Sequence, residues 1–252
     1  MPLAQHIRLR RKDNSVIAPT TCAQRIVARA VLERGETFGL LAFSAADTHV
    51  HMKSACSHAE GEEYARQVEI SITKQLGGAG FAEAKVDPIA EQWHLHNLCD
   101  YILRQDRRHG IEHLDPLREC SNLPDLLGAR LLGAYTLGNL KRALPRWRRD
   151  DFLRLIGVSE LEPADGPLEL LREAAAAAIC RPELAGNARA VTAGLTAAAK
   201  VAEGLLPRAR LATLLGVSRR TVYRLKDREE DPALVHAIRL QLALRRAKLP
   251  PR

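Results

Sequence analysis

The chain is 252 residues long; 46% of the residues are hydrophobic and 27% are charged, a balance typical of a folded protein that excludes wholesale disorder. A chain of this length has room for more than one domain. Lys and Arg number 38 against 30 for Asp and Glu, which gives a net charge of +8. Such an excess favours a polyanionic partner, so we expect the protein to bind nucleic acid.

The cysteines are few and irregularly spaced, and the sequence shows no apolar leader after Met1 and no uncharged apolar run of about 18 residues. An odd number of cysteines at wide spacings argues against a disulfide framework, so we interpret them as reduced thiols. We therefore expect a cytoplasmic protein that is neither exported nor embedded in a membrane. The cysteines are Cys22, Cys56, Cys99, Cys120 and Cys180.

The first part of the chain alternates helical and strand patterns. A weakly patterned segment around 16–17 could supply a first strand, and residues 22–34 have the apolar spacing of a helix that Gly35 can end. Residues 38–43 and the stretch from His49 read as two neighbouring strands of a hairpin.

The pattern then repeats. Residues 60–76 predict a second helix, which Gly77 stops, and residues 81–90 predict a strand whose Pro88 suits the edge of a sheet. A third helix is expected to start near Asn97. The order β-α-β-β-α-β-α predicts an α+β, ferredoxin-like antiparallel sheet with helices on one face.

After Pro116 the strand patterns stop, and we expect only helices. Residues 163–167 have the composition of a linker. We divide the chain into an N-terminal domain at 1–115, a helical extension at 116–203 and a DNA-binding region at 204–252.

Residues 208–227 match a helix-turn-helix, in which Gly216 makes the turn and Ser218 caps the second helix. The exposed face of that second helix is predicted to contact the major groove or its phosphates. Its residues are Arg219, Arg220, Tyr223 and Arg224. The alternative is a helical hairpin with a solvated basic face. A second basic stretch, 141–154, surrounds Trp147, which either stacks on a base or is simply buried.

The residues with chemical potential in the first part are two histidines, a tyrosine and a glutamine. His49 and His51 lie two apart on a predicted strand, so both imidazoles project from one face and could bind one metal ion. Tyr101 and Gln105 lie four apart on the third helix and therefore share a face. Each pair alone also has an ordinary explanation, as a chance histidine pair or as a core tyrosine beside a solvated glutamine.

Other residues compete for the same roles. His94, His96 and Cys99 could form a zinc site, although no second cysteine pair has zinc-ligand spacing. Tyr64, Tyr135 and Tyr223 are alternative nucleophiles, and Tyr64 lies on an apolar stripe that places it in the core.

Together these motifs suggest a family. A strand with His-hydrophobic-His (His49, Val50, His51), followed about fifty residues later by a helix with Tyr-x-x-x-Gln (Tyr101, Gln105), resembles the single-tyrosine HUH transposases. The REP-associated tyrosine transposases look most similar, since the strings YILRQ at 101–105 and NLPDLLGAR at 122–130 also resemble that group. The resemblance covers roughly residues 1–130.

The resemblance implies an enzyme, a transposase that nicks and rejoins single-stranded or hairpin DNA. It implies that His49, His51 and Gln105 bind Mg²⁺ or Mn²⁺ and that Tyr101 attacks a DNA phosphate, giving a 5'-phosphotyrosine and a free 3'-OH. Expected partners are duplex DNA at the helix-turn-helix and a second copy of the chain, with the protein associated with a bacterial nucleoid. The alternative is a transcription regulator that binds DNA through the helix-turn-helix and has no enzymatic activity.

Overall fold

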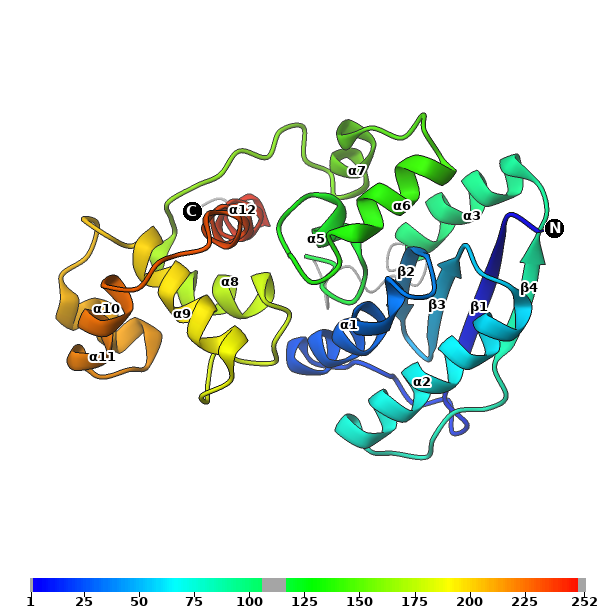
Figure 1. Cartoon of the computed structure of the whole chain (residues 1–252), viewed down its shortest axis with the longest axis horizontal. Helices are drawn as coiled ribbons and strands as arrows, with labels where there is room; N and C mark the ends of the chain where they lie inside the picture. Colours follow the sequence, from blue (N-terminus) through cyan, green and yellow to red (C-terminus); the bar gives the residue numbers. More distant parts are fainter. Residues whose placement is uncertain (1, 106–116, 249–252) are drawn as a thin grey trace.

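The computed structural model describes residues 2–105 and 117–248, which form a sheet-containing part and a helical part (Figure 1). The first part follows the order β-α-β-β-α-β-α. Its elements are β1 (Ala4–Arg10), α1 (Thr21–Gly35), β2 (Leu40–Ala46), β3 (His49–Ser54), α2 (His58–Leu76), β4 (Lys85–Ile89) and α3 (Gln92–Leu103).

The four strands form one sheet in the order β2-β3-β1-β4, and every neighbouring pair is antiparallel. A tight turn at Asp47, whose φ is 53°, joins β2 to β3 and confirms the predicted hairpin. In the sheet His51 lies opposite Arg8 of β1. The strand β4 lies at an edge, which accommodates Pro88 because an edge strand has an unpaired side.

Two boundaries differ from those predicted. The first strand is Ala4–Arg10 and not the segment around 16–17. This strand carries polar residues on the face that α3 covers, so it shows only the short apolar alternation of Ile7 and Leu9. The third helix begins at Gln92, one turn before the expected start near Asn97, because Leu95 already belongs to its buried face.

Helices cover both faces of the sheet, whereas the sequence predicted them on one. Helices α1 and α2 pack on the face that carries Val50 and Met52. Helix α3 and a later helix, α6 (Tyr135–Ala143), pack on the other. The strand β2 shows the reason, since nearly all of its side chains are buried and a strand buried on both faces needs cover on both.

The described residues after 116 form helices and connections, as predicted, apart from a bridge between Ser121 and Ser44 that extends the sheet beyond β2. These helices fall into two groups. Those near the sheet are α5 (Leu123–Leu126), α6 and α7 (Arg149–Leu155). The others are the short η1 (Leu168–Leu170), α8 (Leu171–Ala178), α9 (Arg189–Val201), α10 (Arg208–Leu215), α11 (Arg219–Lys226) and α12 (Pro232–Lys248).

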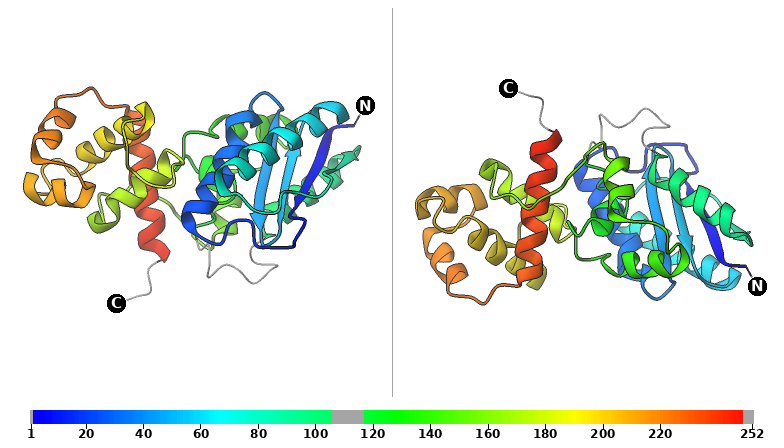
Figure 2. Two further views of the ribbon diagram at one scale, coloured as in Figure 1. Left: turned by 90° about the horizontal axis from the view of Figure 1, so that it is seen from below. Right: turned by 90° about the horizontal axis from the view of Figure 1, so that it is seen from above.

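The second group forms a helical lobe, and its last helix, α12, lies on the side of the lobe that faces the sheet-containing part (Figure 2). Helix α12 packs against the helical lobe with one face and against the sheet-containing part with another. Leu234, Ile238 and Leu242 join the core of the helical lobe, while Leu240 and Leu244 join the core formed by α3, α5, α6 and α7. Among the helices of the described part, none combines the length and apolar character needed to cross a bilayer.

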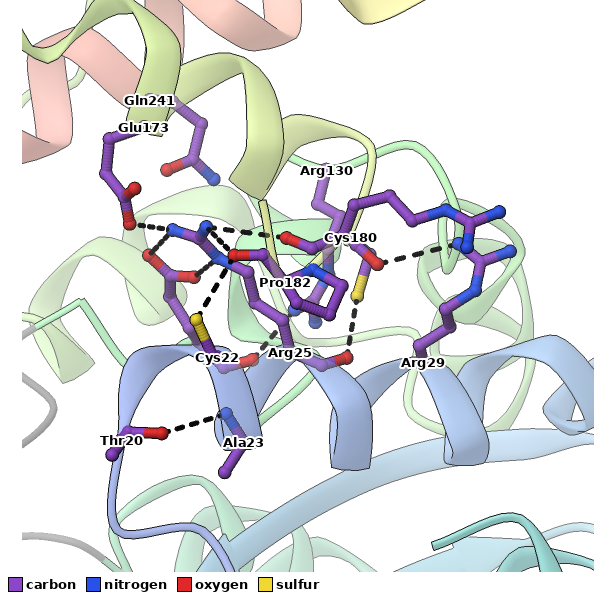
Figure 3. A network of polar contacts seen from close by, with 12 residues as sticks. Thr20, Cys22, Ala23, Arg25, Arg29, Arg130, Glu173, Cys180, Pro182 and Gln241 are labelled. Carbon is purple, nitrogen blue, oxygen red and sulfur yellow. Dashed lines mark hydrogen bonds and ion pairs between the residues drawn. The ribbon is translucent and has the colours of Figure 1, made fainter. Parts of the chain in front are cut away.

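A buried ion network also connects the two parts. Arg25 of α1 bonds to the carboxylate of Glu119, with Nη2 and Oε1 3.1 Å apart, and to Glu173 of α8 (Figure 3). Arg245 of α12 donates to the same Glu119 at 2.6 Å. Both arginines and Glu119 are at most 5% exposed, so this cluster fixes α1, α8 and α12 against one another.

Candidate metal and nucleophile site

The two predicted ligand histidines project from β3 toward α3. Val50 and Met52 enter the core under α1 and α2, so the alternation along the strand turns His49, His51 and Lys53 to the opposite face. His51 is 8% exposed, and the ring centroids of His49 and His51 are 5.9 Å apart. The sequence-based expectation that these imidazoles share a face is therefore confirmed.

Each imidazole has its Nδ1 engaged by a neighbouring polar group. His49 Nδ1 lies 2.8 Å from the hydroxyl of Thr48, and His51 Nδ1 lies 3.2 Å from Nε2 of His6 on β1. Metal-binding histidines are commonly held in this way, with one ring nitrogen hydrogen-bonded and the other facing the metal. These contacts hold the two imidazole rings in fixed orientations.

Tyr101 lies on α3 against this pair. Its ring meets that of His51 edge-on, with centroids 6.1 Å apart, and its side chain is partly buried. Gln105 follows four residues later and is fully buried. Arg118 donates from Nη1 to the carbonyl oxygen of Leu103 at 2.6 Å, which fixes the end of α3 between these two residues. The structure thus brings Tyr101 to the histidines. Helix α3 ends at Leu103, with Arg104 as its C-cap, so Gln105 lies beyond the helix on which the sequence placed it, and the expected shared helix face with Tyr101 is not formed.

The sequence did not identify two residues of this site, His6 and Lys53. Burial, followed by the charges of Lys53 and Arg8, lowers the pKa of His6 to about 4, so His6 is neutral at neutral pH. Lys53 is fully buried and donates from Nζ to the carbonyl oxygen of Leu95 at 3.0 Å, which ties β3 to α3. The His-x-His-x-Lys alternation could have identified Lys53, but His6 becomes visible only once β1 is paired with β3.

The alternative nucleophiles are less suited to attack. Tyr64 is fully buried and its hydroxyl donates to the carbonyl oxygen of Val31 at 2.8 Å. The hydroxyl of Tyr135 donates to the carbonyl oxygen of Leu32 at 2.8 Å. Burial raises the pKa of both phenols, which opposes the formation of a phenolate.

The alternative zinc site does not form. Within residues 2–105 and 117–248, no three His, Cys, Asp or Glu side chains gather in a way that could hold a metal ion. Cys99 is buried beside Lys53, with Sγ and Nζ 3.7 Å apart. His96 meets Trp147 edge-on, and His94 lies beside Trp93, so the three proposed ligands have different surroundings.

The two helices of the predicted helix-turn-helix are present as α10 and α11. Gly216 ends α10 in the left-handed conformation, with φ at 67°, and the Ser218 hydroxyl accepts from the backbone N–H of Thr221 at 3.0 Å. The predicted contact residues Arg219, Arg220, Tyr223 and Arg224 are all exposed on α11. Arg208 of α10 donates to the Tyr223 hydroxyl at 2.5 Å and covers its ring, so this tyrosine is held in place before any ligand binds.

No family model, curated protein or solved structure matches this chain. The assignment of function therefore depends on the residues and on their arrangement.

Proposed function

We propose that the protein is a metal-dependent single-stranded DNA endonuclease and strand transferase that acts through Tyr101. The observation that carries the proposal is the position of Tyr101 against a pair of histidines whose Nδ1 atoms are both held by neighbouring groups. We propose that the sheet belongs to the HUH form of the ferredoxin-like fold, a proposal that the strand order and the β-α-β-β-α-β connectivity support.

In the proposed reaction the Tyr101 hydroxyl oxygen attacks a DNA phosphorus. The new bond joins that oxygen to phosphorus, the bond from phosphorus to the 3'-oxygen breaks, and the phenolic proton ends on the departing 3'-oxygen. The products are a 5'-phosphotyrosine and a free 3'-OH. Another 3'-OH can attack the phosphotyrosine in the reverse sense, which rejoins the strands and restores the phenol.

The donor set proposed for a metal ion is Nε2 of His49, Nε2 of His51 and the side-chain oxygen of Gln105. Two imidazoles with one amide oxygen suit Mn²⁺ better than Mg²⁺, because Mg²⁺ prefers an all-oxygen environment. A bound divalent ion would supply Lewis-acid stabilisation to the attacked phosphate. His6 and Thr48 would hold the two imidazole rings in the orientation that the ligands need.

A graded loss of Mn²⁺ affinity is expected from substitutions at this site. His49→Ala and His51→Ala each remove a ligand and should abolish both measurable binding and nicking. His6→Ala leaves the ligands in place but removes the hydrogen bond to His51, so we expect affinity to fall by about 10- to 100-fold. Calorimetric titration with Mn²⁺ measures these effects.

His58→Ala provides the matched control, because His58 is an exposed histidine on α2. Its Mn²⁺ affinity should equal that of the unsubstituted protein. Wild-type affinity in the His51→Ala protein, or undiminished nicking in EDTA, would refute the metal assignment.

We further propose that α11 binds duplex DNA or the stem of a hairpin. Arg219→Ala and Arg220→Ala should each weaken duplex binding. Where the removed arginine neutralises one DNA phosphate, the slope of log affinity against log salt should become shallower by about 0.9. Single substitutions are preferable to truncation before Gly204, since truncation would also remove α12 from two cores.

Lys74→Ala is the control for the removal of one positive charge, because Lys74 is exposed on α2, far along the chain from α11. If the salt slope changes equally in all three variants, α10 and α11 form a structural hairpin that does not bind DNA. Strong duplex binding by α11, with no nicking under any metal condition, would instead favour the transcription regulator.

A further inference from the structure

A pocket of about 550 Å³ lies beside α3, between its first turns and the chain that follows α6. The hydrogen bond from Gln92 Nε2 to the carbonyl oxygen of Ala143, 2.6 Å long, connects the two walls. The lining residues are Gln92, Trp93, His96, Asn97, Leu144, Pro145, Arg146 and Trp147.

Three of the eight lining residues carry aromatic rings. Trp93 is 64% exposed, an unusual state for so large an apolar side chain, while Trp147 is 7% exposed and forms the inner wall. The His96 ring stands edge-on to Trp147, with centroids 5.5 Å apart. These features suit a flat, polar-edged ring.

The surroundings of the pocket are basic. Arg146 lines it, and the exposed side chains of Lys141, Arg142 and Arg148 belong to the same stretch of chain. Glu91, the N-cap residue of α3, accepts the Nε1–H of Trp93. An aromatic pocket with cations around it matches a base together with its phosphates, the combination by which proteins bind single strands.

The pocket also lies on the same helix as the proposed nucleophile. Asn97 in its wall and Tyr101 are four residues apart on α3 and so share a helix face. Trp93 lies eight residues before Tyr101, which is about 12 Å along the helix axis. A strand whose phosphate meets Tyr101 would therefore bring the base of a nearby nucleotide to this pocket.

We propose that this pocket binds one unpaired nucleobase of the single-stranded DNA substrate by stacking on Trp93 and Trp147. The inference depends on the proposed function only for its choice of substrate. Stacking on an aromatic platform tolerates any base, so the pocket would position the strand without selecting a sequence.

The sequence contains two tryptophans, and both line this pocket, so intrinsic tryptophan fluorescence reports on this pocket alone. Titration with a dT oligonucleotide should quench the emission. An abasic oligonucleotide of the same length, which keeps the phosphates, should quench it much less. Trp93→Ala should lower the affinity for the dT oligonucleotide about 5- to 100-fold, and Trp93→Phe should largely restore it.

Ile70→Ala is the matched control, since Ile70 is 54% exposed on α2 and should leave the affinity unchanged. Equal quenching by the abasic strand or by a blunt duplex, or an unchanged affinity in Trp93→Ala, would overturn the proposal. A covalent-adduct assay on the same samples separates the two proposals. Quenching without any adduct supports base binding in the pocket and refutes the nuclease proposal. An adduct without quenching supports the nuclease proposal and refutes base binding in the pocket.

Discussion

A Tyr101→Phe protein should form no covalent adduct with single-stranded DNA, while its affinity for that DNA stays nearly unchanged. The substitution removes only the attacking oxygen. The phenylalanine ring can keep the edge-on contact with His51, so the histidine pair and α3 should remain in place. A denaturing gel detects the adduct, and fluorescence anisotropy measures binding on the same samples.

Tyr223→Phe is the matched control, because Tyr223 is the most exposed alternative nucleophile and lies on α11. It should form the adduct as the unsubstituted protein does. Persistence of the adduct in Tyr101→Phe, or its absence in Tyr223→Phe, would contradict the assignment of Tyr101 on α3 as the nucleophile.

Glu119→Gln should lower the free energy of unfolding by about 3 to 5 kcal/mol, because it leaves two buried guanidinium groups without their shared carboxylate. Arg25 and Arg245 are 1% and 5% exposed, so water cannot replace the missing partner. Chemical denaturation followed by circular dichroism measures the change. Glu63→Gln is the control, since its ion pair with Arg66 lies on the surface and should contribute less than about 1 kcal/mol.

The same carboxylate predicts a dependence of stability on pH. Burial alone would raise the pKa of Glu119, but the hydrogen bonds of Arg25 and the charges of Arg25, Arg245 and Arg130 outweigh it and hold the pKa below its ordinary value. A carboxylate with a lowered pKa stabilises the fold above its unfolded-state pKa of about 4.3 and loses that contribution as the pH falls further. The difference in stability between the unsubstituted protein and Glu119→Gln should therefore shrink in acid. A constant difference from pH 7 down to about pH 3 would contradict this explanation.

Local signals in the sequence were sufficient for much of the architecture. The hairpin, the second helix and the helix-turn-helix follow from patterns that extend over neighbouring residues, such as the Gly216 turn and the Ser218 cap. The shared face of His49 and His51 follows from the two-residue period of a strand. These expectations required no knowledge of what the elements pack against.

Features that depend on long-range pairing were not predictable in this way. The strand β1 was missed because His6 and Arg8 interrupt its apolar pattern, and the hydrogen bond between His6 and His51 was missed with it. The second layer of helices over the sheet and the two-sided packing of α12 also depend on residues distant in the sequence. Glu119 has no local pattern at all, since its partners lie on α1 and α12.

The most direct test of the central claim is to map the covalent adduct in the unsubstituted protein. The protein is incubated with Mn²⁺ and a randomised pool of single-stranded hairpin oligonucleotides, digested with nuclease and trypsin, and analysed by mass spectrometry. The expected tryptic peptide, residues 86–104, contains Tyr101 as its one tyrosine. We predict that this peptide carries a nucleotide phosphate and that EDTA prevents the modification. A modified tyrosine elsewhere, a modification that forms equally in EDTA, or no adduct across the whole pool would contradict the assignment.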